Sequence, residues 1–248
     1  MWIVVLSASL FLGAADGNAR AQTSAILPNV QQIVERAVNY VITNEDTNTA
    51  LFNRHYKYTR VRTWVYHNEA GKLTDFKQTQ TKENTAQAGP EGGNPKYLVK
   101  GRDLVLRPYP VKNIVARFDF TLIGEESVNG RKAYVIGFVP RKKLPVLQLY
   151  DSLINKATGK VWVDEQDYAI AKAQFHLIPP IKLAYGLVGQ IAEFSCTVLR
   201  SRTVEGLWFV RRMDWHLDGR LITVSRKIDY HDDRAHQLPI IANRQAGS

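Results

Sequence analysis

Short segments of alternating apolar and polar residues, separated by turn dipeptides, constrain the fold of this chain most strongly. In the segment 116–122, for example, Phe118, Phe120 and Leu122 recur at every second position. Asn-Gly and Asp-Gly dipeptides between such segments are typical of tight β-hairpins. The pattern therefore indicates a mainly β protein with a meandering antiparallel sheet or barrel. Since no β–α–β alternation is visible, a Rossmann-type cofactor domain is not expected.

The boundaries of the expected strands follow from the turn signals. We predict strands at residues 58–66, 116–122, 132–138, 148–155, 160–164, 169–177, 191–204, 207–217 and 221–230. The expected turns are Asn129-Gly130, Thr158-Gly159, Glu205-Gly206 and Asp218-Gly219. Two segments interrupt the meander. Gln78–Pro95 is polar and rich in Gly and Pro, which predicts a long loop, and Ile178–Gly189 either covers an opening in the sheet or is a plain crossover.

One amphipathic helix is expected before the strands. Apolar residues between Ile26 and Val41 recur at the i, i+3, i+4, i+7 spacing of a single helical stripe. Pro28 falls in the first turn, where its missing N–H costs least. We expect this helix to fade by Asn44 and a polar loop to continue to Asn48.

The first residues of the chain predict its compartment. The run from Trp2 to Ala15 is largely apolar but shorter than the roughly 20 residues that span a bilayer. Ala19-Arg20-Ala21 matches the pattern that signal peptidase cuts. We therefore expect residues 1–21 to be a signal peptide cleaved after Ala21, and residues 22–248 to form one periplasmic domain without a lipid anchor. A buried N-terminal strand or a membrane anchor is the alternative interpretation.

The last three strands can be placed in register if both of their turns are two-residue hairpin loops. The predicted cross-strand pairs are Phe194/Leu217, Cys196/Trp215, Val198/Met213, Trp215/Ile222 and Met213/Val224. All of these side chains would share one face of the sheet. We predict an apolar ligand cavity on this face, lined by Phe194, Val198, Phe209, Met213, Trp215, Leu217 and Val224.

The same register places Arg200, Arg211 and Arg226 in one row beside the apolar field. Like charges directly opposite each other destabilise a sheet by roughly 0.2–1 kcal/mol per pair, so some partner should offset them. One interpretation is the anionic head group of a ligand, because guanidinium groups suit phosphate and carboxylate. Internal pairing, for example with Glu35, and a longer turn that breaks the row are the alternatives.

Signatures of catalysis or metal binding are absent from the sequence. It contains no G-x-S-x-G, H-E-x-x-H or P-loop motif. We expect the carboxylates around Asp164 to be solvated in a hairpin turn and Cys196 to be a core residue. Neither a cofactor nor a metal is predicted, and the chain is not expected to be an enzyme.

The net charge of +10 favours partners that carry negative charge. Anionic lipid surfaces, nucleic acids and acidic ligands all meet this description. Because export conflicts with nucleic-acid binding, we expect a lipid-like partner and no nucleic acid.

Three stretches carry a family resemblance: Arg117–Lys143, Ile154–Leu177 and Gly206–Arg234. They resemble outer-membrane lipoprotein-sorting proteins of the LolA/LppX-like superfamily. The resemblance implies an unclosed antiparallel half-barrel, with the N-terminal helix and short helical segments covering its concave side. It also implies a hydrophobic cavity for lipid or lipoprotein acyl chains and no cofactor.

Three functions fit this resemblance. The first is a periplasmic carrier, with an inner-membrane transporter or an outer-membrane acceptor as a partner. The second is an envelope sensing or interaction module of the same fold with no transport role. The third is an enzyme on the same scaffold, for which the sequence offers no polar constellation beyond its arginines.

Overall fold

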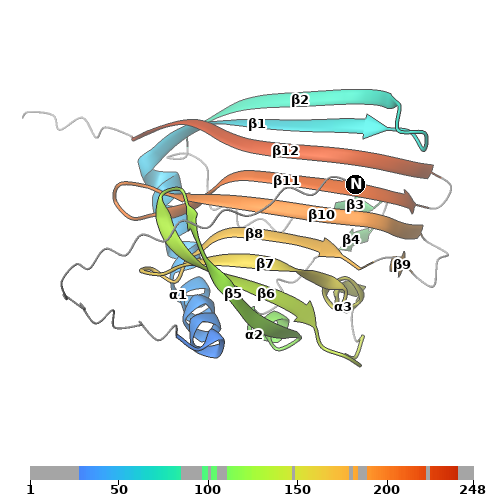
Figure 1. Ribbon diagram of the computed structural model, residues 1–248. Coiled ribbons are helices and arrows are strands. Elements are labelled where there is room, and N and C mark those ends of the chain that lie inside the picture. The colour runs from blue at the N-terminus through green and yellow to red at the C-terminus, as the bar shows by residue number, and fades with distance from the viewer. Residues whose placement is uncertain are drawn as a thin grey trace, which may run out of the picture.

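A single large antiparallel sheet organises the chain in a computed structural model (Figure 1). The structure describes residues 28–84, 97–99, 102–104, 111–146, 149–178, 181–183, 189–221 and 224–239. The predicted signal peptide, residues 1–21, lies outside the described residues. The strand order is β2-β1-β12-β11-β10-β8-β7-β6-β5, and β9 pairs with β10 beside this path. The edge strands β2 and β5 lie at opposite ends of the order, so the sheet is not closed and the expected mainly β architecture is confirmed.

The strands of this sheet are long on one side of the order and shorter on the other. They are β1 (Tyr56–His67), β2 (Leu73–Asn84), β5 (Phe118–Val128), β6 (Arg131–Pro140), β7 (Ala157–Asp164), β8 (Ile170–Leu177), β9 (Ile181–Leu183), β10 (Gly189–Arg202), β11 (Trp208–Leu221) and β12 (Val224–Pro239). A separate two-stranded ribbon consists of β3 (Tyr97–Val99) and β4 (Arg102–Leu104).

The N-terminal helix α1 (Val30–His55) is longer than the sequence pattern predicts. Asn29 caps it by accepting a hydrogen bond from the backbone N–H of Gln31. The predicted loop at residues 44–48 was wrong because tertiary contacts hold this stretch helical. Glu45 pairs with Arg200 of β10 at 2.8 Å, and Phe52 buries its ring against Phe209 of β11.

Two short helices complete the described structure: α2 (Val111–Val115) and α3 (Leu149–Ile154). The strand predicted at residues 148–155 was therefore wrong. None of the helices in the described ranges is long and apolar enough to cross a membrane.

Two of the predicted glycine turns lie inside strands. Gly159 belongs to β7, and a Cβ atom there would lie 2.1 Å from the carbonyl oxygen of Gln174. Gly219 belongs to β11, where a Cβ would lie 3.0 Å from the carbonyl oxygen of Gln190. Both glycines thus permit close approach of neighbouring strands rather than a chain reversal. The predicted loop from Gln78 was also partly wrong, because β2 continues to Asn84 and only the remainder of that loop lies outside the described residues.

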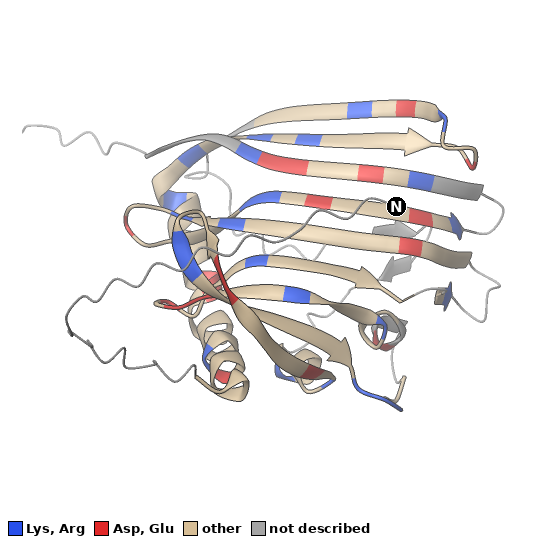
Figure 2. Ribbon diagram, in the orientation of Figure 1, with Lys and Arg blue, Asp and Glu red and all other residues tan. Residues whose placement is uncertain are grey.

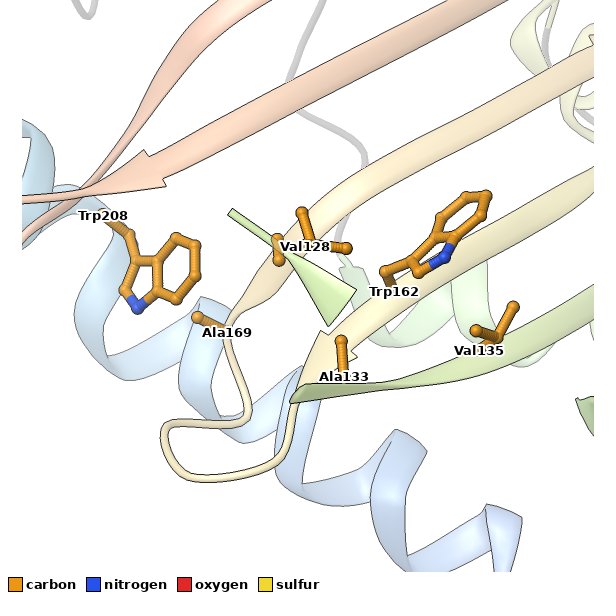
Figure 3. Close-up of a cluster of buried hydrophobic side chains, with 7 residues drawn as sticks. Val128, Ala133, Val135, Trp162, Ala169 and Trp208 are labelled. Atoms are coloured by element: carbon orange, nitrogen blue, oxygen red, sulfur yellow. The ribbon is translucent and has the colours of Figure 1, made fainter. Parts of the chain in front are cut away.

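The two faces of the sheet carry separate parts of the core. We call the face that packs against α1 the helix side and the other face the outer side. On the helix side, Ile33, Val34 and Ala37 of α1 cluster with Ile136 and Val163. A second cluster (Figure 3) consists of Val128, Ala133, Val135, Trp162, Ala169, Ala171 and Trp208. Because side chains alternate along a strand, its members Val135 and Trp162 point to the outer side.

Candidate functional site

An apolar pocket of about 380 Å³ lies between the helices and the β5–β8 part of the sheet. Its volume falls within the roughly 300–1,000 Å³ that is usual for small-ligand sites. All of its lining residues are apolar: Val34, Ala37, Val38, Val41, Val111, Ile114, Val115, Phe118, Phe120, Ile136, Phe138, Ile154, Ala157, Val161, Val163, Ile170 and Phe175. The wall therefore offers no charged or hydrogen-bonding side chain to a ligand.

The residues of this wall recur in the sequence at helical spacing in α1 and mostly at every second position in the strands. The α1 contribution is a single stripe at i, i+3, i+4 and i+7, beginning at Val34. The strands contribute every second residue, as Val161 and Val163 of β7 show. A helix stripe facing the inward positions of four strands produces a cavity when the side chains do not meet across the gap.

A buried arginine fixes one end of the pocket. The guanidinium of Arg117 lies 2.9 Å from the carboxylate of Asp151 in α3. It also donates to the side-chain oxygen of Asn155 at 2.6 Å and to the carbonyl oxygen of Pro145 at 3.2 Å. Asp151 is only 1% exposed, so this ion pair is shielded from water. It joins α3 to the start of β5, next to the pocket residue Phe118.

A row of aromatic rings extends from the pocket across the helix side of the sheet. Phe175, which lines the pocket, lies 6.1 Å from Phe194, and Phe194 lies 6.5 Å from Trp215, measured between ring centroids. Trp215 stacks on Tyr230 at 5.1 Å, and Tyr230 meets Trp64 at 5.1 Å. We call these five rings the aromatic row. It crosses β8, β10, β11, β12 and β1 in order.

The predicted register between β10 and β11 is confirmed over its central part. Phe194 pairs with Leu217, Cys196 with Trp215 and Val198 with Met213. These residues lie on the helix side, because Cys196 also pairs with Phe175. The structure thus brings five of the predicted lining residues, Phe194, Val198, Met213, Trp215 and Leu217, onto one face. None of the five lines the pocket itself.

The register predicted between β11 and β12 was wrong, because Asp218 and Gly219 lie inside β11 and pair with Lys227 and Arg226. Trp215 pairs with Tyr230, and Met213 pairs with Asp232. Val224 pairs through its backbone with Leu221, at the end of the hairpin.

The predicted row of three arginines does not form. A bulge at Leu199/Arg200 pairs Arg200 with Val210 instead of Arg211, and Arg226 pairs with Gly219. The Arg200 side chain is 7% exposed and lies 2.8 Å from the carboxylate of Glu45, so it is paired internally, as the alternative interpretation held, although with a different glutamate. Arg211 is exposed to solvent.

Phe209 was also expected in the cavity, and the structure places it under the C-terminal half of α1. Its ring stacks on Phe52 at a centroid distance of 4.3 Å. Tyr56 and Tyr58 complete this buried cluster. Phe209 therefore holds the helix against the sheet.

The carboxylates of the β7–β8 turn are structural groups. Asp164 is 1% exposed, so the expectation of a solvated turn was wrong. Its oxygens accept from the Arg131 guanidinium at 2.7 and 2.8 Å and from the backbone N–H groups of Gln166 and Asp167. Burial alone would raise the pKa of Asp164, but Arg131 and the two N–H groups hold this pKa below its ordinary value. Asp167 in turn accepts from Trp208 and pairs with Arg202.

Cys196 is buried, as expected of a core residue. Burial raises the pKa of its thiol to about 11, with the nearby carboxylate of Asp214 acting in the same direction. The thiol is therefore a poor nucleophile near neutral pH. Within the described residues, no group of three or more His, Cys, Asp or Glu side chains is arranged to hold a metal ion.

No protein-family model matches the sequence, and no curated protein matches it. Solved structures similar to this chain include an outer membrane lipoprotein-sorting protein domain from Vibrio parahaemolyticus, with a TM-score of 0.35 and 11% identity over 89% of this chain and 95% of that one. A LolA superfamily protein from Nitrosomonas europaea matches with a TM-score of 0.33 and 10% identity, over 85% and 93% of the two chains. MucB in the Pseudomonas aeruginosa MucA/MucB complex matches with a TM-score of 0.26 and 10% identity, over 83% and 99%.

Sequence reasoning missed most of the pocket wall, which lies on α1, α2 and β5–β8. A usable signal was present in the strand segments 133–139 and 161–163, which are apolar at consecutive positions. Strands of this kind are buried on both faces. The strand predicted in place of α3 (Leu149–Ile154) concealed how one end of the pocket is built, because Ile154 of this helix lines the pocket.

Proposed function

We propose that this protein binds the acyl chain of a lipid or lipoprotein in the pocket between α1 and β5–β8. The observation that carries the proposal is the chemistry of the wall, in which every lining side chain is apolar. Burial of hydrocarbon against such a wall contributes about 25 cal/mol of favourable free energy per Å² of apolar surface removed from water. The wall has no group that could orient a polar substrate. It also has no titratable side chain, which supports binding without catalysis and without a cofactor.

The aromatic row extends this site for longer ligands. Phe175 belongs to both the pocket and the row, so hydrocarbon that leaves the pocket can continue over Phe194 and Trp215. Val198, Met213 and Leu217 flank these rings on the same face and are part of the proposed surface. The anionic head group lies, in this proposal, outside the apolar wall.

We infer that the protein works in the bacterial envelope as a periplasmic carrier. The apolar N-terminal run with its Ala19-Arg20-Ala21 motif supports export. An inner-membrane transporter or an outer-membrane acceptor would then deliver or receive the ligand. An interaction module with the same fold would use its surface and leave the pocket unfilled.

Native mass spectrometry of the protein purified from its host, followed by organic extraction, tests this function. We expect a copurifying species with an acyl chain, or uptake of an added fatty acid at a ratio near one to one. A mass without ligand, combined with no uptake of added lipid, would contradict the proposal and favour the interaction module.

A substitution that fills the pocket makes the test specific. Ala157→Phe places a ring in the wall, and we expect it to weaken fatty-acid uptake about tenfold or more, because the ligand then competes for the same volume. Ala116→Phe is the matched control, since Ala116 is exposed and does not line the pocket. Equal uptake by both variants would remove the pocket as the binding site.

A further inference from the structure

A cationic segment follows β6 directly, at the end of the molecule that carries α2 and α3. Residues 141–146, here called the basic loop, read Arg-Lys-Lys-Leu-Pro-Val. The three cations Arg141, Lys142 and Lys143 are all exposed. Figure 2 shows this charge as a blue segment beyond the arrowhead of β6 in the lower right of the view.

Little negative charge balances these cations. Arg141 lies 3.0 Å from the carboxylate of Asp119, in a pair that is exposed on both sides. Within the described residues, Lys142 and Lys143 form no ion pair. Lys112 adds a further exposed cation on the neighbouring α2. The surface therefore presents net positive charge to a partner.

Exposed aliphatic side chains flank the cations. Val139, at the end of β6, is 53% exposed, and Val146, at the end of the basic loop, is 61% exposed. Both belong to the small set of exposed large apolar side chains in the described residues. Cations interspersed with exposed apolar side chains are the combination that binds an anionic bilayer interface, because the charges attract the head groups and the apolar groups enter the boundary region.

The loop is held in a defined shape. The backbone N–H of Arg141 donates to the carbonyl oxygen of Arg117 at 2.9 Å, and Arg117 binds the carbonyl oxygen of Pro145. Lys143 has a φ of 59°, in the left-handed region, so the chain reverses sharply there. The same Arg117 neighbours the pocket residue Phe118, which places the basic loop beside the pocket wall.

We propose that the basic loop, with Val139 and Lys112, docks the protein on an anionic phospholipid bilayer. Docking here would bring the pocket end of the molecule to the membrane. The docking surface goes beyond the proposed acyl-chain site and does not depend on what fills the pocket.

Cosedimentation with vesicles tests the docking surface. The purified protein is mixed with phosphatidylcholine vesicles that contain or lack phosphatidylglycerol, at low and at high salt. We expect binding only to the phosphatidylglycerol vesicles, and weaker binding as salt screens the charges. Binding that is equal for the two compositions, or no binding to either, would overturn the proposal.

Charge reversal at the loop identifies the surface. Each cation near an anionic membrane contributes about fivefold in affinity, so the double variant Lys142→Glu/Lys143→Glu should bind at least about twenty-five-fold more weakly. The control Lys57→Glu/Lys132→Glu changes the net charge by the same amount at exposed positions near the opposite ends of the strands. An equal loss in both double variants would show that net charge alone drives binding and would overturn the proposal.

A neutral substitution separates the apolar contribution. Val146→Ser leaves every charge in place and should weaken vesicle binding about fourfold, with the loss persisting at high salt. Unchanged binding would contradict insertion of this residue. Fatty-acid uptake measured without vesicles should be the same in all of these variants, so failure of the docking surface and failure of the pocket give different results.

Discussion

The two halves of the sheet differ in how many of their faces are buried. In the pocket half, β5–β8, Ile136 and Val163 point to the helix side, while Val135 and Trp162 are buried on the outer side. In the open half, formed by β10, β11, β12, β1 and β2, the aromatic row occupies the helix side. There the outer side carries polar pairs, such as His216 with Asp229 at 2.6 Å.

This difference follows from the strand sequences. The central strands of the pocket half, β6 and β7, are apolar at consecutive positions and are covered on both faces, whereas β5 alternates and leaves Asp119 and Thr121 exposed. In the open half, the central part of β11 alternates as Met213-Asp214-Trp215-His216-Leu217, so one face of this strand can remain in water. The pocket half therefore encloses the pocket, and the aromatic row runs from the pocket residue Phe175 onto the open half.

The helix α1 is the element that both halves share, and its C-terminal part provides the largest expected effect. Phe52 is 1% exposed and contacts three aromatic rings, those of Tyr56, Tyr58 and Phe209. Phe52→Ala should lower the free energy of unfolding by about 3–5 kcal/mol, because it leaves a cavity where the helix meets the open half. Denaturant unfolding followed by circular dichroism measures this change.

The control for this prediction lies on the same helix. Ile42 is 51% exposed, so Ile42→Ala should change the free energy of unfolding by no more than about 0.5 kcal/mol. If the two variants were equally stable, the C-terminal half of α1 would not be needed to hold the sheet.

The second-largest expected effect on stability comes from the ion pair between Arg131 and the buried Asp164, at the β7–β8 turn of the pocket half. Asp164→Asn removes the charge that Arg131 contacts and should cost about 2 kcal/mol at neutral pH. Since the folded pKa of Asp164 lies below its ordinary value, the stabilisation is complete above the unfolded pKa of about 3.9 and is lost as the pH falls through the folded pKa. The difference between wild type and variant should therefore shrink below about pH 4, as urea unfolding at several pH values would show. A difference that grows on acidification would contradict this assignment.

The sequence predicts the structure of each half only where the deciding signal lies within one strand or one turn. The central β10–β11 register follows from alternation and one turn, because Cys196 and Trp215 must share a face. The bulge beside Arg200 has no local signal. At the bulge, Arg200 pairs with Glu45, which lies 155 residues away in the sequence, so local alternation could not reveal this contact.

The pocket was harder to predict because it too depends on contacts between residues that are far apart in the sequence. Its wall needs α1 to lie across β5–β8, and this depends on long-range packing of Val34 and Ala37 against Ile136 and Val163. A hydrophobic stripe predicts that a helix packs, but it does not say on which strands. The sequence therefore predicted an apolar surface on β10 and β11, whereas the pocket that the structure shows lies between α1 and β5–β8.

Under the proposed function, ligand length is the variable that separates the contributions of the two halves to binding. Trp215→Ala removes a ring from the middle of the aromatic row without touching the pocket wall. We expect about tenfold weaker binding of a long-chain fatty acid, which the row would contact, and unchanged binding of a short-chain one. Isothermal titration with the two fatty acids measures this difference. Equal losses for both would mean that the variant disturbs the pocket, and no loss for either would confine the ligand to the pocket half.

The smallest effect is expected for a polar pair on the outer side of the open half. His231 lies 2.6 Å from Asp214, which is as close as Arg131 lies to Asp164, but half of its side chain is exposed. Water can replace the lost contact in His231→Gln, so the free energy of unfolding should change by no more than about 0.5 kcal/mol. The same denaturant series used for Asp164→Asn provides the comparison. A cost near 2 kcal/mol for His231→Gln would mean that the outer side of the open half is shielded from water in solution, for example by a partner. The two halves would then no longer differ in how many of their faces are buried.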